Sequence, residues 1–202
     1  MLKRTLVAAA ITFAAVSAQA QQVLISQGFN SVAGLVGKGW SLTNASTPIG
    51  SVNNWFQGDS TQFAAQAGAS DSYIAGNFNL AAAGGTIDAL LVTPTFSTER
   101  SGNVSFRARA VIDSDPTFFD QLRFGLIPSA AAPLIAAPDQ ETLGGPSTTI
   151  PGVWTLYTVG FAAQGVGSTA RFAIEYTGAA DTSNYVGIDT LTVSAVPEPS
   201  SW

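Results

Sequence analysis

Apolar and polar residues alternate along several short stretches of the chain. The clearest stretch is 103–112, where every second residue from Val104 to Ile112 is apolar and Ser105, Arg107 and Arg109 lie between. A period of two is typical of a β-strand that buries one face. The same alternation recurs at 121–127, 154–161 and 171–176. The pattern therefore predicts a protein built from half-buried strands.

Four shorter candidate strands complete the pattern, at 23–29, 72–78, 89–92 and 185–194. Breaks rich in Gly and Pro are expected between strands, at 81–85, 113–116, 128–151 and 165–168. Outside the first 20 residues, no stretch keeps the spacing of an amphipathic helix for three turns. The Ala-rich segments 64–69 and 130–137 are interrupted by Gly or Pro and are expected to be loops. Many short strands with such punctuation predict an all-β, antiparallel β-sandwich.

The last candidate strand contains a phase error. Val186 and Ile188 share one face, whereas Leu191 and Val193 would point to the opposite face. A β-bulge near Asp189 would bring all four apolar residues to one face, because an extra residue resets the alternation. A strand buried on both faces explains the same pattern, so both interpretations stay open.

A bulge would also leave Asp189 beside backbone carbonyl groups without strand partners. Calcium accepts carboxylate and carbonyl oxygens together, so Asp189 is a candidate calcium ligand. The alternative is that its carboxylate caps a turn or faces solvent. Asp113 and Asp115 are second candidates for a metal, although their stretch lacks the Gly and the distal Glu of an EF-hand. A solvated loop between two strands is the competing interpretation.

Composition limits the chemistry that is available. The chain has no His and no Cys, which excludes Ser-His-Asp hydrolysis, Cys-His proteolysis and ordinary zinc sites. It carries 8 Lys+Arg against 13 Asp+Glu, and this acidic balance opposes binding to nucleic acid. Glu175 is expected to form a cross-strand ion pair with Arg107, Arg109 or Arg123. A catalytic carboxylate pair of the glycosidase kind is the alternative.

Aromatic residues that stand near amide side chains suggest a carbohydrate site. An exposed ring of Trp55 would stack on a sugar, and the amides of Gln57, Asn77 and Asn79 would bond its hydroxyl groups. Trp55 follows two Asn residues and is placed either at the rim or in the core. Aromatic residues of sandwiches usually fill the core, which is the favoured position for Trp40.

The first 20 residues have the layout of a secretory signal peptide. Lys3 and Arg4 precede an apolar run that is shorter than the about 20 residues of a membrane-spanning helix. Small residues at Ala18 and Ala20 predict cleavage after Ala20. We therefore expect export by the Sec machinery, removal of residues 1–20 by signal peptidase and one domain at 21–195.

The chain ends with Val-Pro-Glu-Pro-Ser-Ser-Trp at 196–202. Val196, Pro197, Glu198 and Pro199 resemble the recognition motif of the PEP-CTERM sorting tag. In that family a membrane helix and an arginine cluster follow the motif, whereas this sequence stops at Trp202, about where the helix would begin. The resemblance implies an exosortase as a partner. It also implies a location at the surface or in the extracellular matrix of a Gram-negative-type bacterium.

A set of different short motifs follows along the chain in a characteristic order. The motifs are Gly28-Phe29, Gly39-Trp40, Trp55 to Gly58, Ser72 to Phe78, Leu91 to Pro94, Val104 to Arg107, Asp120 to Leu122 and Gly187 to Leu191. This order resembles a choice-of-anchor J domain, which is similar to cleaved-adhesin and MAM-like jelly rolls. The resemblance implies a jelly-roll sandwich and an extracellular binding or adhesive module, calcium-stabilised in some members.

The first strand departs from the pattern of the related jelly rolls. They often carry an acidic residue beside the first-strand Phe, whereas Gln27 and Asn30 flank Phe29 here. Their amide oxygens can coordinate calcium with less charge, which makes them further candidate ligands beside Asp189.

These observations predict an exported, non-catalytic surface or matrix module that binds an extracellular polysaccharide or a surface protein. Two alternatives stay open. One is a secreted glycan-active enzyme that uses carboxylates, and the other is a purely structural matrix protein.

Overall fold

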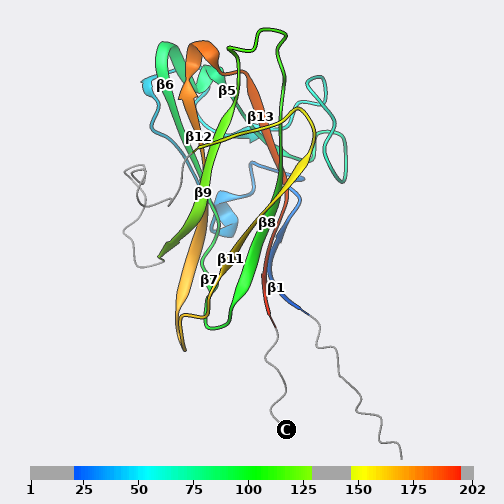
Figure 1. Ribbon diagram of the computed structural model, residues 1–202, viewed down its shortest axis with the longest axis vertical. Coiled ribbons are helices and arrows are strands. Elements are labelled where there is room, and N and C mark those ends of the chain that lie inside the picture. Colours follow the sequence, from blue (N-terminus) through cyan, green and yellow to red (C-terminus); the bar gives the residue numbers. More distant parts are fainter. Residues whose placement is uncertain (1–20, 129–146, 197–202) are drawn as a thin grey trace, which may run out of the picture.

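The computed structural model describes residues 21–128 and 147–196. In these residues it contains two antiparallel β-sheets and three short 3₁₀ helices but no α-helix (Figure 1). The predicted all-β, jelly-roll sandwich is confirmed. The predicted signal peptide with its cleavage site at Ala20 and the motif residues Pro197, Glu198 and Pro199 lie outside the described residues. In the described part, no helix is long and apolar enough to cross a membrane.

The first sheet has six strands in the order β11-β8-β13-β5-β4, with β1 also paired to β13. Their bounds are β1 (Gln22–Gln27), β4 (Phe56–Gln57), β5 (Ile74–Asn77), β8 (Gly102–Ala110), β11 (Thr155–Phe161) and β13 (Tyr185–Ala195). We call it sheet A. Its strands β8 and β11 correspond to stretches with alternation in the sequence, and β13 corresponds to the candidate strand with the phase error.

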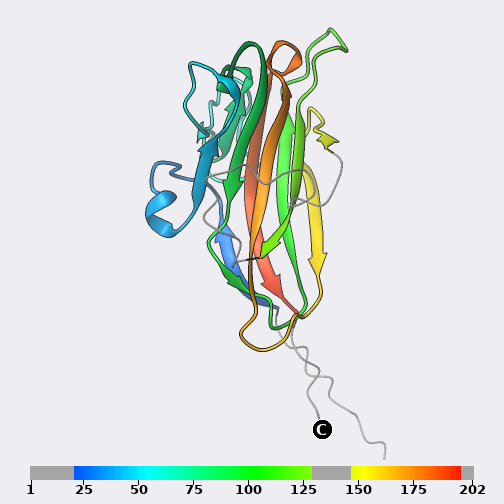
Figure 2. The ribbon, with the colours of Figure 1, turned by 90° about the vertical axis from the view of Figure 1, so that its left-hand side faces the viewer.

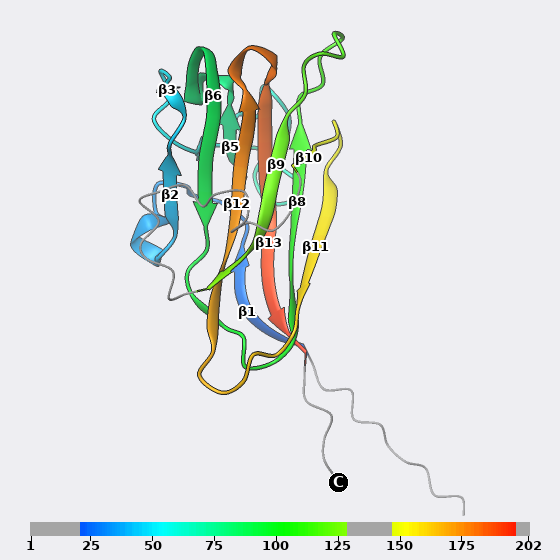
Figure 3. The ribbon, with the colours of Figure 1, turned by 60° about the vertical axis from the view of Figure 1, so that its left-hand side comes forward.

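The second sheet, sheet B, has seven strands in the order β10-β9-β12-β6-β2, with β3 paired to β6 and β7 paired to β12. Their bounds are β2 (Ser41–Asn44), β3 (Thr47–Ile49), β6 (Ala81–Val92), β7 (Phe96–Ser97), β9 (Gln121–Pro128), β10 (Thr148–Thr149) and β12 (Thr169–Ala179). The two sheets lie side by side as separate layers in Figure 1, and the turned views look onto sheet B with sheet A behind it (Figures 2 and 3).

Two boundary predictions are wrong. The expected break at 81–85 is the first part of β6, because β3 pairs with it through Thr47 opposite Thr86 and Ile49 opposite Ala81. Ile112 was expected to face inward but is 62% exposed, because β8 ends at Ala110.

The main core fills the space between the sheets. It holds the inward residues of β8, such as Phe106, together with Phe172 and Ile174 of β12. Trp40 and Trp55 are both buried in this core. Burial of these large side chains is the principal stabilising contribution, at roughly 1.5–3 kcal/mol for each fully buried large apolar residue.

Of the two interpretations of the phase error, the bulge in β13 is confirmed, and the strand is also buried on both faces. The register between β13 and β8 shifts between Asp189 and Thr192, and Thr190 has a φ of 50°. An extra residue on one strand restores the alternation. As a result, the apolar residues on both sides of the bulge, Val186 and Ile188 before it and Leu191 and Val193 after it, lie in the same core.

The segment 58–72, between β4 and β5, packs against the face of sheet A that points away from the core. Phe63, Tyr73 and Tyr185 form a separate aromatic cluster there, with Trp154 packed against it. Gly187 is required beneath this cluster, since a Cβ at this position would lie 2.7 Å from the Tyr73 ring. The segment is therefore held as a fixed part of the fold.

The two ends of the described domain lie together. Gln22 of β1 pairs with Ala195 of β13, at the lower end of the sandwich in Figure 1. The adjoining Val196 donates a backbone hydrogen bond to the Ser101 carbonyl. The turns β5–β6 and β12–β13 lie at the opposite end (Figure 1), which is where the candidate site is found.

Candidate functional site

Three connecting segments meet at the end of the sandwich opposite Gln22 and Ala195. They are η2 (Phe78–Leu80) after β5, η3 (Ala180–Thr182) between β12 and β13, and the loop 111–120 between β8 and β9. Backbone bonds join them, from Phe78 N–H to the Asn184 carbonyl at 3.0 Å and from Phe119 N–H to the Thr182 carbonyl at 2.9 Å. Residues far apart in the sequence therefore form one surface.

The turn at η2 explains why Phe78 points outward. The Asn77 side chain caps η2 by accepting a hydrogen bond from Asn79 N–H at 3.1 Å. An Asn cap is favourable because its carbonyl satisfies an otherwise unpaired amide. Leu80 is buried and anchors the turn, whereas Phe78 remains 44% exposed.

Asp120 fixes the loop 111–120 to the neighbouring strands. Its carboxylate is buried, accepts a hydrogen bond from the Tyr176 hydroxyl and also accepts the backbone N–H groups of Asn184 and Tyr185 at 2.9 and 3.2 Å. Burial raises the pKa of Asp120, and these hydrogen bonds oppose the rise. This buried anchor makes the far end of the sandwich a defined surface.

The three segments enclose a cleft of about 350 Å³. This is near the lower end of the volumes of small-molecule sites. Its lining residues are Phe78, Asn79, Ala81, Ala83, Asp113, Phe118, Ala180, Asp181, Ser183 and Asn184. We call it the end cleft.

The end cleft combines ring faces with free hydrogen-bonding groups. Within the described residues, Phe78 and Phe118 are in contact with no other aromatic ring. In the same part of the chain, the amides of the Asn79 and Asn184 side chains form no hydrogen bond. An apolar ring face beside free amides can hold a ring-shaped ligand that carries hydroxyl groups.

The structure separates the predicted carbohydrate-binding residues. Asn79 lines the end cleft, and Asn77 orients it by capping η2. Trp55 is not at the rim, since it is 4% exposed and packs near Tyr176 in the core. Gln57 accepts a bond from Val32 N–H and donates to the carbonyls of Phe29, Asp71 and Tyr73, so its amide is used within the fold.

Asp189 acts as a hydrogen-bond acceptor inside the protein. Its Oδ2 accepts the N–H groups of Gln66 and Ala67 at 2.9 and 3.1 Å, and its Oδ1 accepts Thr190 N–H at 2.6 Å. Burial raises the pKa of this carboxyl, and the three hydrogen bonds oppose the rise. Both carboxylate oxygens therefore accept hydrogen bonds from the protein itself, which agrees with the alternative that this carboxylate caps a turn.

The other candidate calcium ligands lie in two places. Gln27 Oε1 accepts Phe29 N–H at 2.8 Å, and the Asn30 side chain lies beside Gly68, near the segment that Asp189 binds. Asp113 lines the end cleft, and Asp115 accepts Thr117 N–H within the same loop. Among the described residues, no three His, Cys, Asp or Glu side chains are placed to hold a metal ion. Calcium binding stays a prediction.

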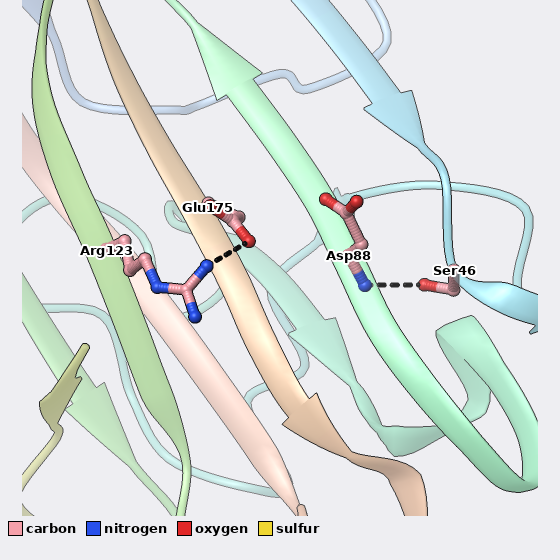
Figure 4. Close-up of polar contacts among 4 residues, drawn as sticks. All are labelled: Ser46, Asp88, Arg123 and Glu175. Atoms are coloured by element: carbon pink, nitrogen blue, oxygen red, sulfur yellow. Dashed lines mark hydrogen bonds and ion pairs between the residues drawn. The ribbon is translucent and has the colours of Figure 1, made fainter. Parts of the chain in front are cut away.

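Glu175 forms the expected cross-strand ion pair, and Arg123 of β9 is its partner at 3.2 Å (Figure 4). The pair lies on the face of sheet B away from the core, and Asp88 of β6 lies on the same face. The Glu175 side chain is buried rather than exposed to solvent. Neither its Oε2 atom nor the Oδ1 atom of Asp88 has a hydrogen-bond partner. Burial raises the pKa of both carboxyls.

Sequence reasoning missed most of the end cleft. Phe78 was placed inside a strand, and Phe118, Asp181 and Asn184 were given no role. The available signal was an aromatic residue between two Asn residues, at 77–79, where a short turn leaves the ring outside.

No family model matches this chain, and no curated protein matches it. Solved structures with the same fold are the cleaved adhesin domains of Lys-gingipain. The K1 domain from Porphyromonas gingivalis W83 is 19% identical with a TM-score of 0.56, covering 86% of this chain and 98% of that one. The K3 domain from the same strain is 16% identical with a TM-score of 0.55, covering 88% and 100%.

The K2 domain of Lys-gingipain is 18% identical with a TM-score of 0.52, over 84% of this chain and 98% of that one. At such identities the similarity shows the fold alone. The chain therefore has the jelly-roll sandwich of a cleaved adhesin domain. The resemblance to the choice-of-anchor J family stays a prediction.

Proposed function

We propose that this protein is an exported, non-catalytic binding module that holds a carbohydrate in the end cleft. The observation that carries the proposal is the exposed Phe78 ring beside the unbonded amides of Asn79 and Asn184. A sugar presents an apolar ring face and a rim of hydroxyl groups, which match these two kinds of group. A surface protein is the alternative ligand.

The position of the cleft supports display on a surface. The turns that line it, between β5 and β6 and between β12 and β13, lie at the end of the sandwich away from the paired residues Gln22 and Ala195 (Figure 1). A domain attached through the segment after Ala195 would present the end cleft outward. We include sorting by an exosortase and a place at the cell surface or in the matrix in the proposal, on the basis of the motif at 196–199.

A catalytic role for Glu175 has little support. The carboxylate is buried on the outer face of sheet B and paired to Arg123, whereas a glycosidase needs two carboxylates that flank an accessible bond. The end cleft contains two Asp side chains but no Glu.

A glycan array followed by titration calorimetry tests the proposal. Phe78→Ala removes the ring face and should weaken binding of the best glycan by about tenfold, or about 1.4 kcal/mol. Phe119→Ala is the matched control, because Phe119 is also exposed but does not line the cleft. Failure to bind any glycan, or an equal loss in both variants, would contradict a carbohydrate site here.

A further inference from the structure

The end cleft contains two carboxylates and no basic side chain. Asp113 comes from the loop 111–120 and Asp181 from η3, and no Lys or Arg is among the lining residues. Both side chains are exposed to solvent. The charge of the cleft therefore comes from these two groups, in a protein whose formal net charge is −5.

Each carboxylate keeps one oxygen for a ligand. Asp181 Oδ1 accepts Gly84 N–H at 2.9 Å, and Asp113 Oδ1 accepts Asp115 N–H at 2.9 Å. The Oδ2 atom of each residue accepts no hydrogen bond from the described residues. The bonds to Oδ1 anchor each carboxylate to the backbone, so two negatively charged hydrogen-bond acceptors line the cleft.

This arrangement selects among sugars by charge. An acidic sugar would place its carboxylate near two like charges, which is unfavourable. A sugar with a primary ammonium group would meet carboxylates that line the same cleft, and ammonium groups are also attracted to the face of an aromatic ring such as Phe78. A neutral sugar gains neither of these contributions.

We propose that the end cleft prefers glycans whose units carry a free amine, such as de-N-acetylated hexosamine oligomers. The sugar ring lies on Phe78, the amides of Asn79 and Asn184 bond the hydroxyl groups, and the ammonium group lies between Asp113 and Asp181. This inference rests on the proposed function and specifies the class of ligand.

The test compares two β-linked oligosaccharides of equal length, one of glucosamine and one of N-acetylglucosamine, at a pH where the amine is protonated. Calorimetry should show at least about tenfold tighter binding of the glucosamine oligomer, since this corresponds to one charge-assisted contact. High salt should reduce the preference because the cleft is open to solvent. An oligouronate should bind more weakly than either.

Substitutions show which carboxylates cause the preference for the glucosamine oligomer. Asp113→Asn and Asp181→Asn keep the Oδ1 acceptor, and each should reduce the affinity for the glucosamine oligomer several-fold without changing that for the N-acetylated one. Asp115→Asn is the matched control, because it removes the same charge from the same loop outside the cleft. It should leave the preference intact.

The outcomes separate the two proposals. Equal binding of both oligomers that Phe78→Ala abolishes would overturn the amine preference and leave the carbohydrate site standing. An amine preference that Asp115→Asn reduces as much as Asp181→Asn would reflect general charge attraction and would also overturn the inference. Binding of neither oligomer would overturn the amine preference, and the glycan array then decides whether the carbohydrate site stands.

Discussion

Asp189 shows how one side chain joins two distant parts of this fold. It is fully buried in β13, and its carboxylate accepts backbone N–H groups from Gln66 and Ala67 in the segment 58–72. The bulge at Thr190 turns the carboxylate toward that segment and supplies a third donor. The residue therefore couples the irregular part of β13 to the segment that covers sheet A.

Asp189→Asn should lower the free energy of unfolding by about 2 kcal/mol. Its amide nitrogen cannot accept a hydrogen bond, so at least one buried N–H group loses its partner. Urea denaturation of both proteins measures the difference. An unchanged midpoint would show that the three hydrogen bonds add nothing to stability.

The same variant tests the calcium prediction for Gln27, Asn30 and Asp189. A site that binds only the folded state raises stability with ligand concentration, by roughly 2.7 kcal/mol at a hundredfold excess over the Kd. Calcium bound here should raise the Tm of the natural protein over that in chelator, and Asp189→Asn should abolish the rise. A Tm of the natural protein that does not respond to calcium would contradict calcium binding.

Gly187 is a position where the absence of a side chain is required. Gly187→Ala would place a Cβ 2.7 Å from Tyr73 and 2.9 Å from Phe63. The segment 58–72 must then shift, and we expect a loss of about 2 kcal/mol in stability. Trp154 contacts both rings and donates to the Ala64 carbonyl, so its fluorescence should change.

Gly160→Ala is the matched control for this prediction. Gly160 lies in β11 of the same sheet, where the nearest atom to an added Cβ is 3.4 Å away. It should leave the fluorescence and stability nearly unchanged. Equal effects of the two substitutions would contradict the close approach at Gly187.

At the scale of elements, the outer face of sheet B carries an excess of negative charge, from the buried Glu175 and the partly buried Asp88. Asp88 and Glu175 lie on neighbouring strands with Arg123 as the cation paired to Glu175 (Figure 4). Burial raises the pKa of Asp88 more than the Arg123 charge lowers it. The buried Oδ1 of Asp88 has no hydrogen bond, which is unfavourable for the ionised carboxylate and lowers stability.

Asp88→Asn and Glu175→Gln should therefore have opposite effects at neutral pH. Asp88→Asn removes a charge whose Oδ1 has no partner and should stabilise the protein slightly, by about 0.5 kcal/mol after allowance for solvent screening. Glu175→Gln leaves Arg123 without its anion and should destabilise it by about 1–3 kcal/mol. Denaturation of both variants checks the signs, and destabilisation by Asp88→Asn would contradict this account.

The long strands could be predicted from the sequence because each contains enough residues to show the period of two. The bulge in β13 could be predicted because four apolar residues would otherwise occupy two faces. Strands β2, β3, β4, β7 and β10 have two to four residues and show no period. The first half of β6 is rich in Ala and Gly, and its pairing with β3, which no local pattern shows, makes it a strand.

The end cleft could be predicted only in part, for a related reason. Asn79 was predicted to bind a carbohydrate and Asp113 a metal ion, so the two residues were not assigned to one site. The cleft forms because η2, η3 and the loop 111–120 meet at one end of the sandwich, and no local pattern encodes that meeting. Trp55 was a candidate for the site because its neighbours in the sequence are polar, but it is buried in the core.

For the molecule as a whole, four buried or partly buried carboxyls in the described part of the chain make stability depend on pH. Burial is the largest cause of the raised pKa at Asp88, Asp120, Glu175 and Asp189. A carboxyl with a raised pKa in the folded state binds protons more readily there than in the unfolded chain. Its contribution to stability is complete below the unfolded pKa of about 4 and is lost as the pH rises through the folded pKa.

Two exposed carboxyls act in the opposite direction at lower pH. Hydrogen bonds from Thr61 and Thr117 lower the pKa of Asp59 and Asp115, so their contributions are lost only as the pH falls below about 4. The acidic balance of the chain adds repulsion between carboxylates as the pH rises. We therefore expect the highest stability in mildly acidic solution, at about pH 5, and a decline toward pH 8.

Urea midpoints measured across this range test the expectation on the natural protein and on Asp88→Asn. The natural protein should unfold at a lower urea concentration at about pH 8 than at about pH 5, and Asp88→Asn should reduce that difference because one of the four carboxyls no longer titrates. The exposed variant Asp115→Asn is the control and should leave it unchanged. A midpoint that rises from pH 5 to pH 8 would show that the buried carboxyls are stabilised as anions in the folded protein.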